Sequence, residues 1–369
     1  GGMGTVRQVR DRLGNRVLAM KVLHTKLVEE TNSLLRFVQE AQVCAQLQHP
    51  NILPIYDLGV LATGHLYFTM AEIKGDSLDV YIKRVHDACV QGQWSDAEGE
   101  WNLYRLVAAF YDVCKAASHA HEHGVVHRDL KPKNIMIGRL GEVLVVDWGL
   151  AKVIGQEDIE ESVVTMRSQD DEYATVAGPI YGTPAYVAPE VAMGQGDEAN
   201  ERTDIYALGA VLYEILRGRR AFAGKSLYSL LLNVVSNEPP SFLTPEDDYS
   251  TCVPNEYDSQ VKTSVYVSYK GAALPSVLVE VCHRAMAKDP MDRFGSVSEM
   301  IEIIGQWLDG SQRREHALSL AARAHEYDDL IASIEEESQG FELAACVLER
   351  DIKPWESETT KVDAWTLRD

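Results

Sequence analysis

The sequence has 369 residues, of which 46% are hydrophobic and 25% are charged, an ordinary balance for a globular protein. Its 56 acidic residues outnumber its 35 lysines and arginines, which gives a formal net charge of −21. So acidic a surface argues against non-specific attraction to nucleic acid or to anionic membranes, and we expect no nucleic-acid partner.

The cysteines and the apolar stretches indicate the cellular setting. The six cysteines are Cys44, Cys89, Cys114, Cys252, Cys282 and Cys346. They form no C-x-x-C pair, so we expect reduced thiols and a cytoplasmic protein. No apolar run approaches the roughly 18 residues of a membrane span, and no signal peptide is visible. Because the sequence opens without an initiator methionine, we interpret it as a piece of a longer protein.

The chain begins with a glycine cluster followed by two predicted strands. Gly1, Gly2 and Gly4 precede residues 6–23, which read as two extended stretches joined by a turn at 11–15. Glycines let backbone amides approach a phosphate because no Cβ stands in the way, although glycine clusters also mark ordinary turns. A dinucleotide-binding fingerprint requires a helix directly after its glycines, and none is predicted here.

A lysine in the second predicted strand needs explanation. Lys21 has apolar residues on either side, and a buried ammonium group is costly without a partner. The alternative is an edge-strand lysine that faces water. A helix is predicted over residues 32–46, with Asn32 as a plausible N-cap and an apolar face at helical spacing. Glu40 lies on this helix and, taken alone, reads as solvated surface.

Further along, a strand at residues 66–70 leads into a polar link and then a long predicted helix at 101–122. The helix ends in a histidine-rich turn before Gly124, a typical helix stop. His119 and His123 are four residues apart, a spacing that also suits a metal ion. No third ligand is evident, so we expect instead that these histidines interact favourably with the dipole at the C-terminal end of the helix.

Residues 127–149 carry the densest polar chemistry of the chain. They read His-Arg-Asp-Leu-Lys-Pro-Lys-Asn-Ile-Met-Ile, a short turn, and then Val-Leu-Val-Val-Asp-Trp-Gly. Two acids, an amide and a lysine thus lie on a loop beside an apolar hairpin. Phosphoryl transfer needs such a set, because a carboxylate must orient the attacking hydroxyl while cations neutralise the phosphates.

This stretch resembles the catalytic loop and the D-F-G motif of protein kinases, with Trp148 in place of Phe. The segment Gly-Thr-Pro-Ala-Tyr-Val-Ala-Pro-Glu at 182–190 resembles the family's G-T-x-x-Y-x-A-P-E. The resemblance covers about residues 1–309 and implies an α+β, bilobed kinase fold. It implies an N-lobe at 1–72 that lacks its first strand, a C-lobe at 73–309 and a helical extension at 310–369.

By this resemblance, Asp129 orients the substrate hydroxyl and accepts its proton, while Lys131 supports the γ-phosphate. Asn134 and Asp147 are expected to hold Mg²⁺, with Mn²⁺ as an alternative. A lysine two residues after the aspartate is typical of serine/threonine rather than tyrosine kinases. We expect Trp148 to pack beside Cys44 and His127 without abolishing activity.

The resemblance also implies an ATP site and an anchoring ion pair between Lys21 and Glu40. Lys21 lies in Leu-Ala-Met-Lys, which is similar to V-A-I-K on the family's third strand. The other residues expected to contact ATP are Gly1, Gly2, Gly4, Val6, Ala19, Met70, Ala71, Ile73 and Met136.

The acidic segment at residues 152–179 is similar in place to an activation loop, and by composition it also reads as a solvated, mobile loop. Its candidate phosphorylation sites are Ser162, Thr165, Ser168 and Thr175. A phosphate there is expected to pair with Arg128 and order the loop. Four further residues are expected to be structural. These are Thr183 near Asp129, Asp204 supporting the catalytic loop, and Glu190 paired with Arg293.

The sequence therefore predicts a serine/threonine protein kinase of the bacterial type that uses Mg-ATP. Its expected substrates are proteins, including its own activation loop, with self-association for transfer between copies. The alternative is a pseudokinase scaffold, motivated by Trp148, the acidic loop and the missing first glycine.

Residues 239–273 read as an insertion with a strand at 263–269, either surface decoration or a docking feature. Residues 313–350 read as one or two helices of an extension like that of large multidomain bacterial kinases.

Overall fold

The computed structural model describes residues 4–24, 27, 31–89, 100–154, 183–242 and 273–351, together with residues 362 and 366. The chain divides into two compact units, Gly1–Leu308 and Asp309–Asp369. Within the described residues, no helix is both long and apolar enough to cross a membrane.

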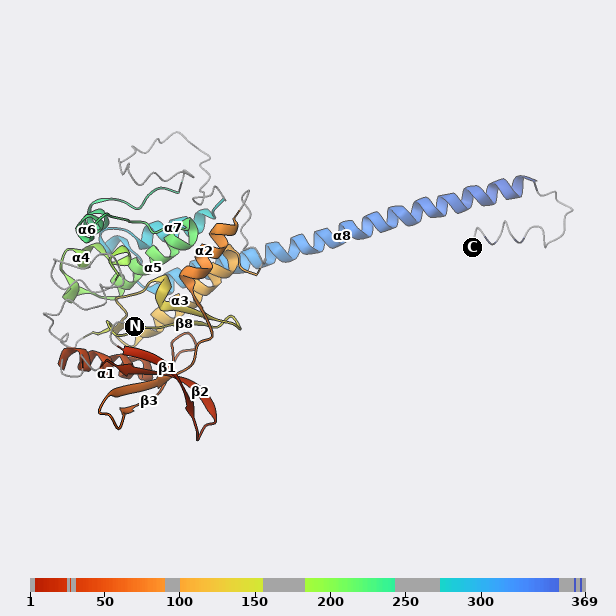
Figure 1. Cartoon of the computed structure of the whole chain (residues 1–369). Coiled ribbons are helices and arrows are strands. Elements are labelled where there is room, and N and C mark those ends of the chain that lie inside the picture. Colours follow the sequence, from red (N-terminus) through yellow and green to blue (C-terminus); the bar gives the residue numbers. More distant parts are fainter. Residues whose placement is uncertain are drawn as a thin grey trace. The chain divides into compact units, whose positions relative to one another are not determined.

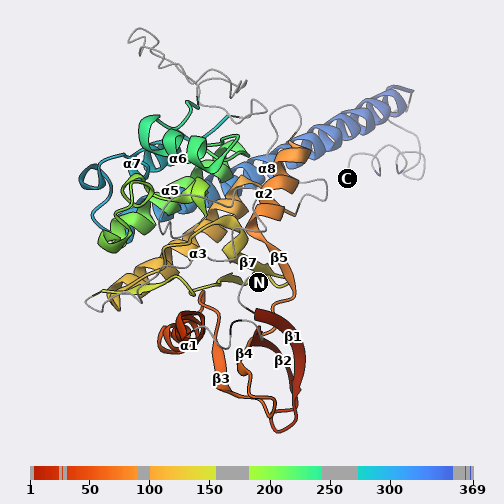
Figure 2. The same ribbon diagram turned by 60° about the vertical axis from the view of Figure 1, so that its left-hand side comes forward.

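The N-terminal part of the first unit is an antiparallel sheet of four strands flanked by a helix (Figures 1 and 2). The strands are β1 (Gly4–Asp11), β2 (Arg16–Leu23), β3 (Ile55–Val60) and β4 (Leu66–Met70), in the order β1-β2-β4-β3. Helix α1 (Thr31–Gln46) packs on the sheet through Phe37, whose ring centroid lies 4.9 Å from that of Phe68. Burial of these rings fixes α1 against the strand that carries Phe68.

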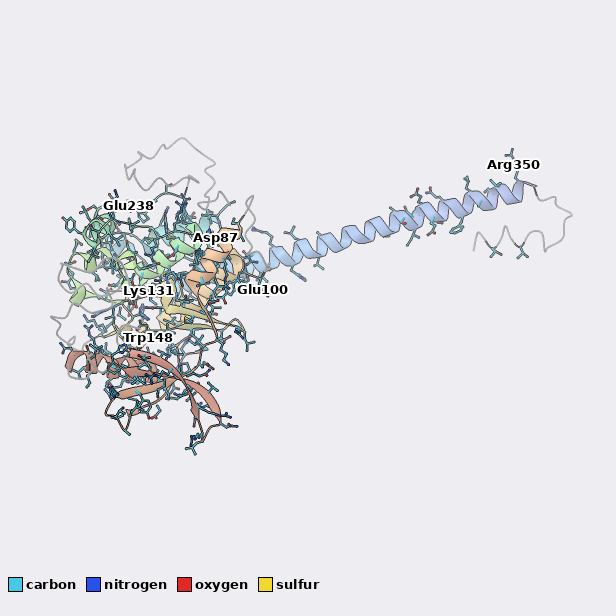
Figure 3. All side chains as sticks on the ribbon, viewed as in Figure 1. Asp87, Glu100, Lys131, Trp148, Glu238 and Arg350 are labelled. Carbon is cyan, nitrogen blue, oxygen red and sulfur yellow. The ribbon has the colours of Figure 1, made fainter. Side chains whose placement is uncertain are left out.

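Short strands connect this sheet to the helical part of the unit. They are β5 (Gly75–Ser77), β7 (Ile135–Gly138) and β8 (Val143–Val145) in one sheet, and β6 (Val125–Val126) with β9 (Lys152–Val153) in another. Val145 donates its amide hydrogen to the carbonyl of Asn51, which ties this region to the chain between α1 and β3. Figure 3 shows Lys131 and Trp148 at this level, between the N-terminal strands and the helices.

The remainder of the first unit is mainly helical. Its α-helices are α2 (Leu78–Ala88), α3 (Leu103–Glu122), α4 (Pro189–Ala192), α5 (Glu201–Arg217), α6 (Leu227–Ser236) and α7 (Ser276–Ala285). Short 3₁₀ helices are η2 (Pro132–Asn134), η4 (Pro184–Tyr186), η5 (Gly196–Glu198) and η6 (Pro290–Asp292). A strand-rich first part and a helical second part confirm the predicted α+β, bilobed fold.

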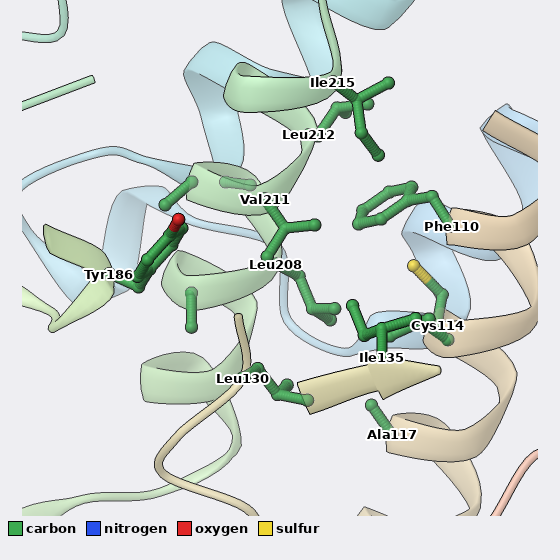
Figure 4. Packing of buried hydrophobic residues seen from close by; sticks show 14 of the residues in the cluster. Phe110, Cys114, Ala117, Leu130, Ile135, Tyr186, Leu208, Val211, Leu212 and Ile215 are labelled. Carbon is green, nitrogen blue, oxygen red and sulfur yellow. The ribbon is translucent and has the colours of Figure 1, made fainter. Parts of the chain in front are cut away.

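The core of the helical part forms between α3 and α5. Phe110 and Cys114 of α3 face Leu208 and Leu212 of α5, and Ile135 packs into the same cluster (Figure 4). Asn200 caps α5 in a capping box with Thr203, and Gly218 ends the helix in the left-handed conformation that glycine adopts without strain. The catalytic stretch predicted from sequence is therefore attached to α3 and α5 through Leu130 and Ile135.

One helix, α8 (Val297–Asp351), begins earlier than the helical stretch predicted from residue 313. Its first turns bury Val297, Met300, Ile304 and Leu308, whose spacing places them on one helical face. The division between the two units falls within this helix, after Leu308.

Candidate active site

Lys21 of β2 and Glu40 of α1 form a buried ion pair. The ammonium nitrogen of Lys21 lies 2.6 Å from Oε1 and 2.8 Å from Oε2 of Glu40. A Cβ added at Gly149 would lie 3.1 Å from Glu40 Oε2 and 3.7 Å from Asp147 Oδ1. The glycine therefore leaves room for the Glu40 carboxylate beside Asp147.

The carboxylate of Asp129 is held by three side chains from two loops. Asn134 donates its amide hydrogens to Asp129 Oδ2, at 2.9 Å, and to the Asp129 carbonyl, at 2.8 Å. Lys131 Nζ lies 3.0 Å from Asp129 Oδ2. Thr183 donates to Asp129 Oδ1 from both its amide nitrogen, at 2.9 Å, and its hydroxyl, at 3.1 Å. Thr183 therefore lies beside Asp129, as the sequence predicted.

A second aspartate, Asp204 of α5, holds the backbone just before Asp129. It accepts hydrogen bonds from the amides of His127, at 2.7 Å, and Arg128, at 2.9 Å, and from His121 Nε2, at 2.8 Å. Burial raises the pKa of this carboxyl, but the His121 hydrogen bond and the charges nearby outweigh burial and lower it. These bonds support the left-handed conformation of Arg128, whose φ is 65°.

Asp147 and Trp148 follow the hairpin of β7 and β8. The backbone at Asp147 is left-handed, with φ of 69°, and Val146 donates its amide hydrogen to the Asn134 carbonyl at 2.9 Å. Trp148 is 1% exposed, and its ring centroid lies 4.5 Å from that of His127. The predicted contact of Trp148 with His127 is thus present, and Cys44 belongs to the same large hydrophobic cluster.

Asn134 and Asp147 provide the oxygen atoms that a divalent cation prefers. Because the Asn134 amide nitrogen donates to Asp129, the side-chain oxygen of Asn134 remains for a cation. The backbone bond between Val146 and Asn134 keeps the two segments adjacent. The donor chemistry of these two residues therefore fits a hard divalent metal ion.

Several residues expected at the adenine site lie together on neighbouring strands. Ala19 of β2 pairs with Met70 at the end of β4, and Val6 of β1 pairs with Lys21. Met136 lies on β7, opposite Ser77 of β5. Two further residues, Ala71 and Ile73, follow β4 and are half-buried. Gly4 starts β1, where a Cβ would lie 2.6 Å from the Val22 carbonyl oxygen.

Glu190 and Arg293 form a bidentate ion pair. Arg293 Nη1 donates to Glu190 Oε1 at 2.9 Å, and Nη2 donates to Oε2 at 2.8 Å. Arg293 also donates to the carbonyls of Ala287, Arg202 and Lys288. A fully buried guanidinium thus has a partner on every side, as its burial requires.

Some predicted residues lie outside the described part of the chain. These are Gly1 and Gly2, the hydroxyl residues Ser162, Thr165, Ser168 and Thr175, and the predicted strand at 263–269. Of the residues expected to regulate the site, only Arg128 lies in the described part of the chain, and it is 9% exposed.

Sequence reasoning missed the role of His121. It considered His119 and His123 and favoured a contact with the helix dipole over a metal ion, and in the structure their rings lie beside each other, with centroids 4.4 Å apart. His121, between them, faces inward and donates to Asp204. Its position on the apolar face of α3, in line with Ala117 and Ala120, was the available signal.

Comparison with known proteins identifies relatives of the chain. Residues 1–303 match the family model described as "Protein kinase domain". The serine/threonine-protein kinase PknD of Protochlamydia amoebophila is 35% identical over 314 residues, which cover 84% of this chain and 29% of that protein. PknD of Chlamydia trachomatis is 32% identical over 347 residues, which cover 90% of this chain and 34% of that protein.

A probable serine/threonine-protein kinase of Corynebacterium efficiens is 32% identical over 331 residues. These cover 88% of this chain and 41% of that protein. The chain thus spans about a third of the length of the curated relatives it matches.

Proposed function

Because the chain belongs to the protein kinase family, we propose that it transfers the γ-phosphate of ATP to serine and threonine hydroxyls of proteins. The observation that carries this proposal is the arrangement around Asp129. Its carboxylate lies within hydrogen-bonding distance of Lys131, Asn134 and Thr183, from two separate loops. Such a carboxylate, held beside a lysine, suits the orientation of a hydroxyl nucleophile.

The residues of the site divide the work of phosphoryl transfer among them. Asp129 orients the substrate hydroxyl and accepts its proton, and Lys131 stabilises negative charge on the transferred phosphoryl group. Lys21, held by Glu40, positions the phosphates of ATP. Asn134 and Asp147 hold a divalent metal ion, for which we propose Mg²⁺ rather than Mn²⁺. When bound, this ion neutralises charge on the phosphate oxygens.

The preference for serine and threonine rests on two observations. Lys131 follows Asp129 by two residues and contacts the hydroxyl of Thr183. The relatives described above are named serine/threonine-protein kinases. The alternative of a pseudokinase scaffold has no comparable support, since Lys21, Glu40, Asp129, Asn134 and Asp147 are all present.

We further propose that the kinase phosphorylates its own segment at residues 152–179, with Arg128 binding the resulting phosphate, and that two copies associate for this transfer. The hydroxyl residues of that segment in the sequence support this. Cysteine usage supports a cytoplasmic location. We propose the domain limits 1–72, 73–309 and 310–369 for the two lobes and the extension.

The test uses the full-length protein with γ-labelled ATP, Mg²⁺ and a general protein substrate, beside the variant Asp147→Asn. We expect label on serine and threonine, and roughly 100-fold less label with the variant, because an amide carries no charge to hold the metal ion. Equal labelling by the two proteins would contradict the proposed activity. Label on tyrosine alone would contradict the proposed specificity.

A further inference from the structure

A cavity of about 430 Å³ lies directly beside the Asp129 cluster. Lys131 and Thr183, which both contact the Asp129 carboxylate, also line this cavity. A protein substrate whose hydroxyl reaches Asp129 must therefore place neighbouring residues at or near this cavity. Figure 3 labels Lys131 and Asp87, which come from different elements of its wall.

The charge of this cavity is opposite to that of the chain. The chain has more acidic than basic residues, 56 against 35. Five lysines and arginines but only three acidic residues line the cavity. The five are Lys83, Lys131, Lys133, Arg219 and Arg220. A local excess of cations in an acidic protein, next to the reacting carboxylate, favours an anionic occupant.

The three acidic residues of the lining, Asp79, Asp87 and Glu214, all have interactions within the chain. Glu214 accepts a hydrogen bond from the Tyr186 hydroxyl at 2.5 Å, and burial raises the pKa of the Glu214 carboxyl although the charges of Arg220 and Lys133 act in the opposite direction. Asp79 accepts from the Ser77 hydroxyl at 2.5 Å and lies in the first turn of α2, where the helix dipole favours a carboxylate. Even with all three carboxylates counted as charged, the five lysines and arginines of the lining remain in excess.

Two of the lysines are available to a ligand. Lys83 on α2 and Lys133 on η2 are both exposed. Lys133 lies close enough to Glu214 for its charge to lower the pKa of that carboxyl. The two lysines come from different elements that approach each other at the cavity, since α2 packs against η2. Two long, mobile ammonium groups facing one cavity are suited to a carboxylate or a phosphate group.

We propose that this cavity binds an anionic side chain of the protein substrate, aspartate, glutamate or a phosphorylated residue, close in sequence to the accepting hydroxyl. The proposal rests on the kinase activity proposed above and names the class of substrate for the same site. A substrate with lysine or arginine at that position faces the exposed ammonium groups of Lys83 and Lys133 and is rejected by repulsion.

The test measures kcat/KM of the full-length protein on a set of peptides with one central serine. At each of four positions on either side of the serine, the residue is alanine, lysine, aspartate or phosphoserine. At one position or more we expect aspartate or phosphoserine to be preferred over alanine by about tenfold, the effect of one charge-assisted hydrogen bond. Lysine at that position is expected to be disfavoured relative to alanine.

Lys133→Glu is expected to abolish or invert the ratio of kcat/KM between the aspartate and lysine peptides. Lys83→Glu, on the exposed face of α2, tests the same ratio should Lys133→Glu fold poorly. Lys225→Glu makes the same charge change at an exposed lysine that does not line the cavity, and it should keep the wild-type ratio.

The possible failures are distinguishable. If no peptide is phosphorylated under any condition, the proposed kinase activity itself is overturned. If peptides are phosphorylated without preference for an anion, or the ratio survives both charge reversals in the cavity, only the proposed anion site is overturned. A preference for phosphoserine without one for aspartate supports the site and identifies phosphorylated substrates as its ligands.

Discussion

Glu40 of helix α1 places both carboxylate oxygens within 2.8 Å of the ammonium nitrogen of Lys21. The two residues are 5% and 8% exposed, so neither charge is well solvated. Each therefore depends on the other, because a buried charge without a partner is strongly unfavourable. The pair also joins α1 to the sheet at the place where the phosphates of ATP are expected.

The first prediction concerns this pair. Lys21→Met should lower kcat/KM for phosphotransfer by roughly 100-fold or more, because no cation then positions the phosphates. Glu40→Gln should lower it less, since the amide oxygen still accepts one hydrogen bond from Lys21. Steady-state kinetics with ATP as the varied substrate distinguishes the two. If Lys21→Met retains wild-type kcat/KM, the assigned role of the lysine is wrong.

The second prediction concerns Asp204, which joins α5 to the backbone before Asp129. In Asp204→Asn one acceptor oxygen is replaced by a donor that faces backbone amides, and we expect a loss of about 3 kcal/mol in the free energy of unfolding. Chemical denaturation at neutral pH measures this loss. An unchanged denaturation midpoint would show that the observed bonds to His127 and Arg128 contribute little.

The Asp204 carboxyl should also make the free energy of unfolding depend on pH. Its pKa in the folded state lies below the ordinary value of 3.8, so the unfolded state binds its proton first as the pH falls. The stabilisation by Asp204 is therefore complete above about pH 4 and disappears as the pH falls through the folded-state pKa. The difference in unfolding free energy between wild type and Asp204→Asn should shrink over that range.

The third prediction concerns Arg293. Its guanidinium group is fully buried and donates to Glu190 and to three carbonyl oxygens. Lysine keeps the charge but lacks the planar set of five donors, so Arg293→Lys should lower the free energy of unfolding by about 3 kcal/mol. Arg284→Lys, at a half-exposed surface pair, is a matched control that should change it by less than about 1 kcal/mol. Equal effects of the two substitutions would contradict this account.

The fourth prediction concerns Trp148, the departure from the usual phenylalanine. The indole ring is buried beside His127, and its Nε1–H donates a long hydrogen bond of 3.4 Å to the Val145 carbonyl. Trp148→Phe should therefore cost about 1–2 kcal/mol of stability and leave phosphotransfer within roughly threefold of wild type. A loss of activity without a loss of stability would mean that the indole has a functional role of its own.

Site residues were predictable from the sequence where their interactions join residues close in sequence, and not where they join distant ones. Lys21, Asp129, Asn134 and Asp147 were recognisable because their neighbours in sequence form motifs that phosphoryl transfer requires. The contact between His121 and Asp204 was not, because it joins residues 83 positions apart and depends on how α3 packs against α5.

The same reason explains two further differences. Whether Lys133 and Lys83 face one cavity depends on the approach of η2 to α2, which no local pattern encodes. The early start of α8 depends on burial of Val297 and Met300 against the helical core. By contrast, β1, β2, β4 and α1 were predicted close to their observed bounds, because alternation and helical periodicity are local signals, whereas β3 was not predicted.

The central claim is that Asp129 orients the attacking hydroxyl, and Asp129→Asn in the full-length protein tests it most directly. Asparagine retains the hydrogen bonds from Thr183 but cannot take a proton. We expect kcat to fall by at least about 100-fold while the affinity for ATP, measured by calorimetry, stays within about threefold of wild type. Wild-type kcat in this variant, with a normal affinity for ATP, would contradict the assignment of the active site to Asp129.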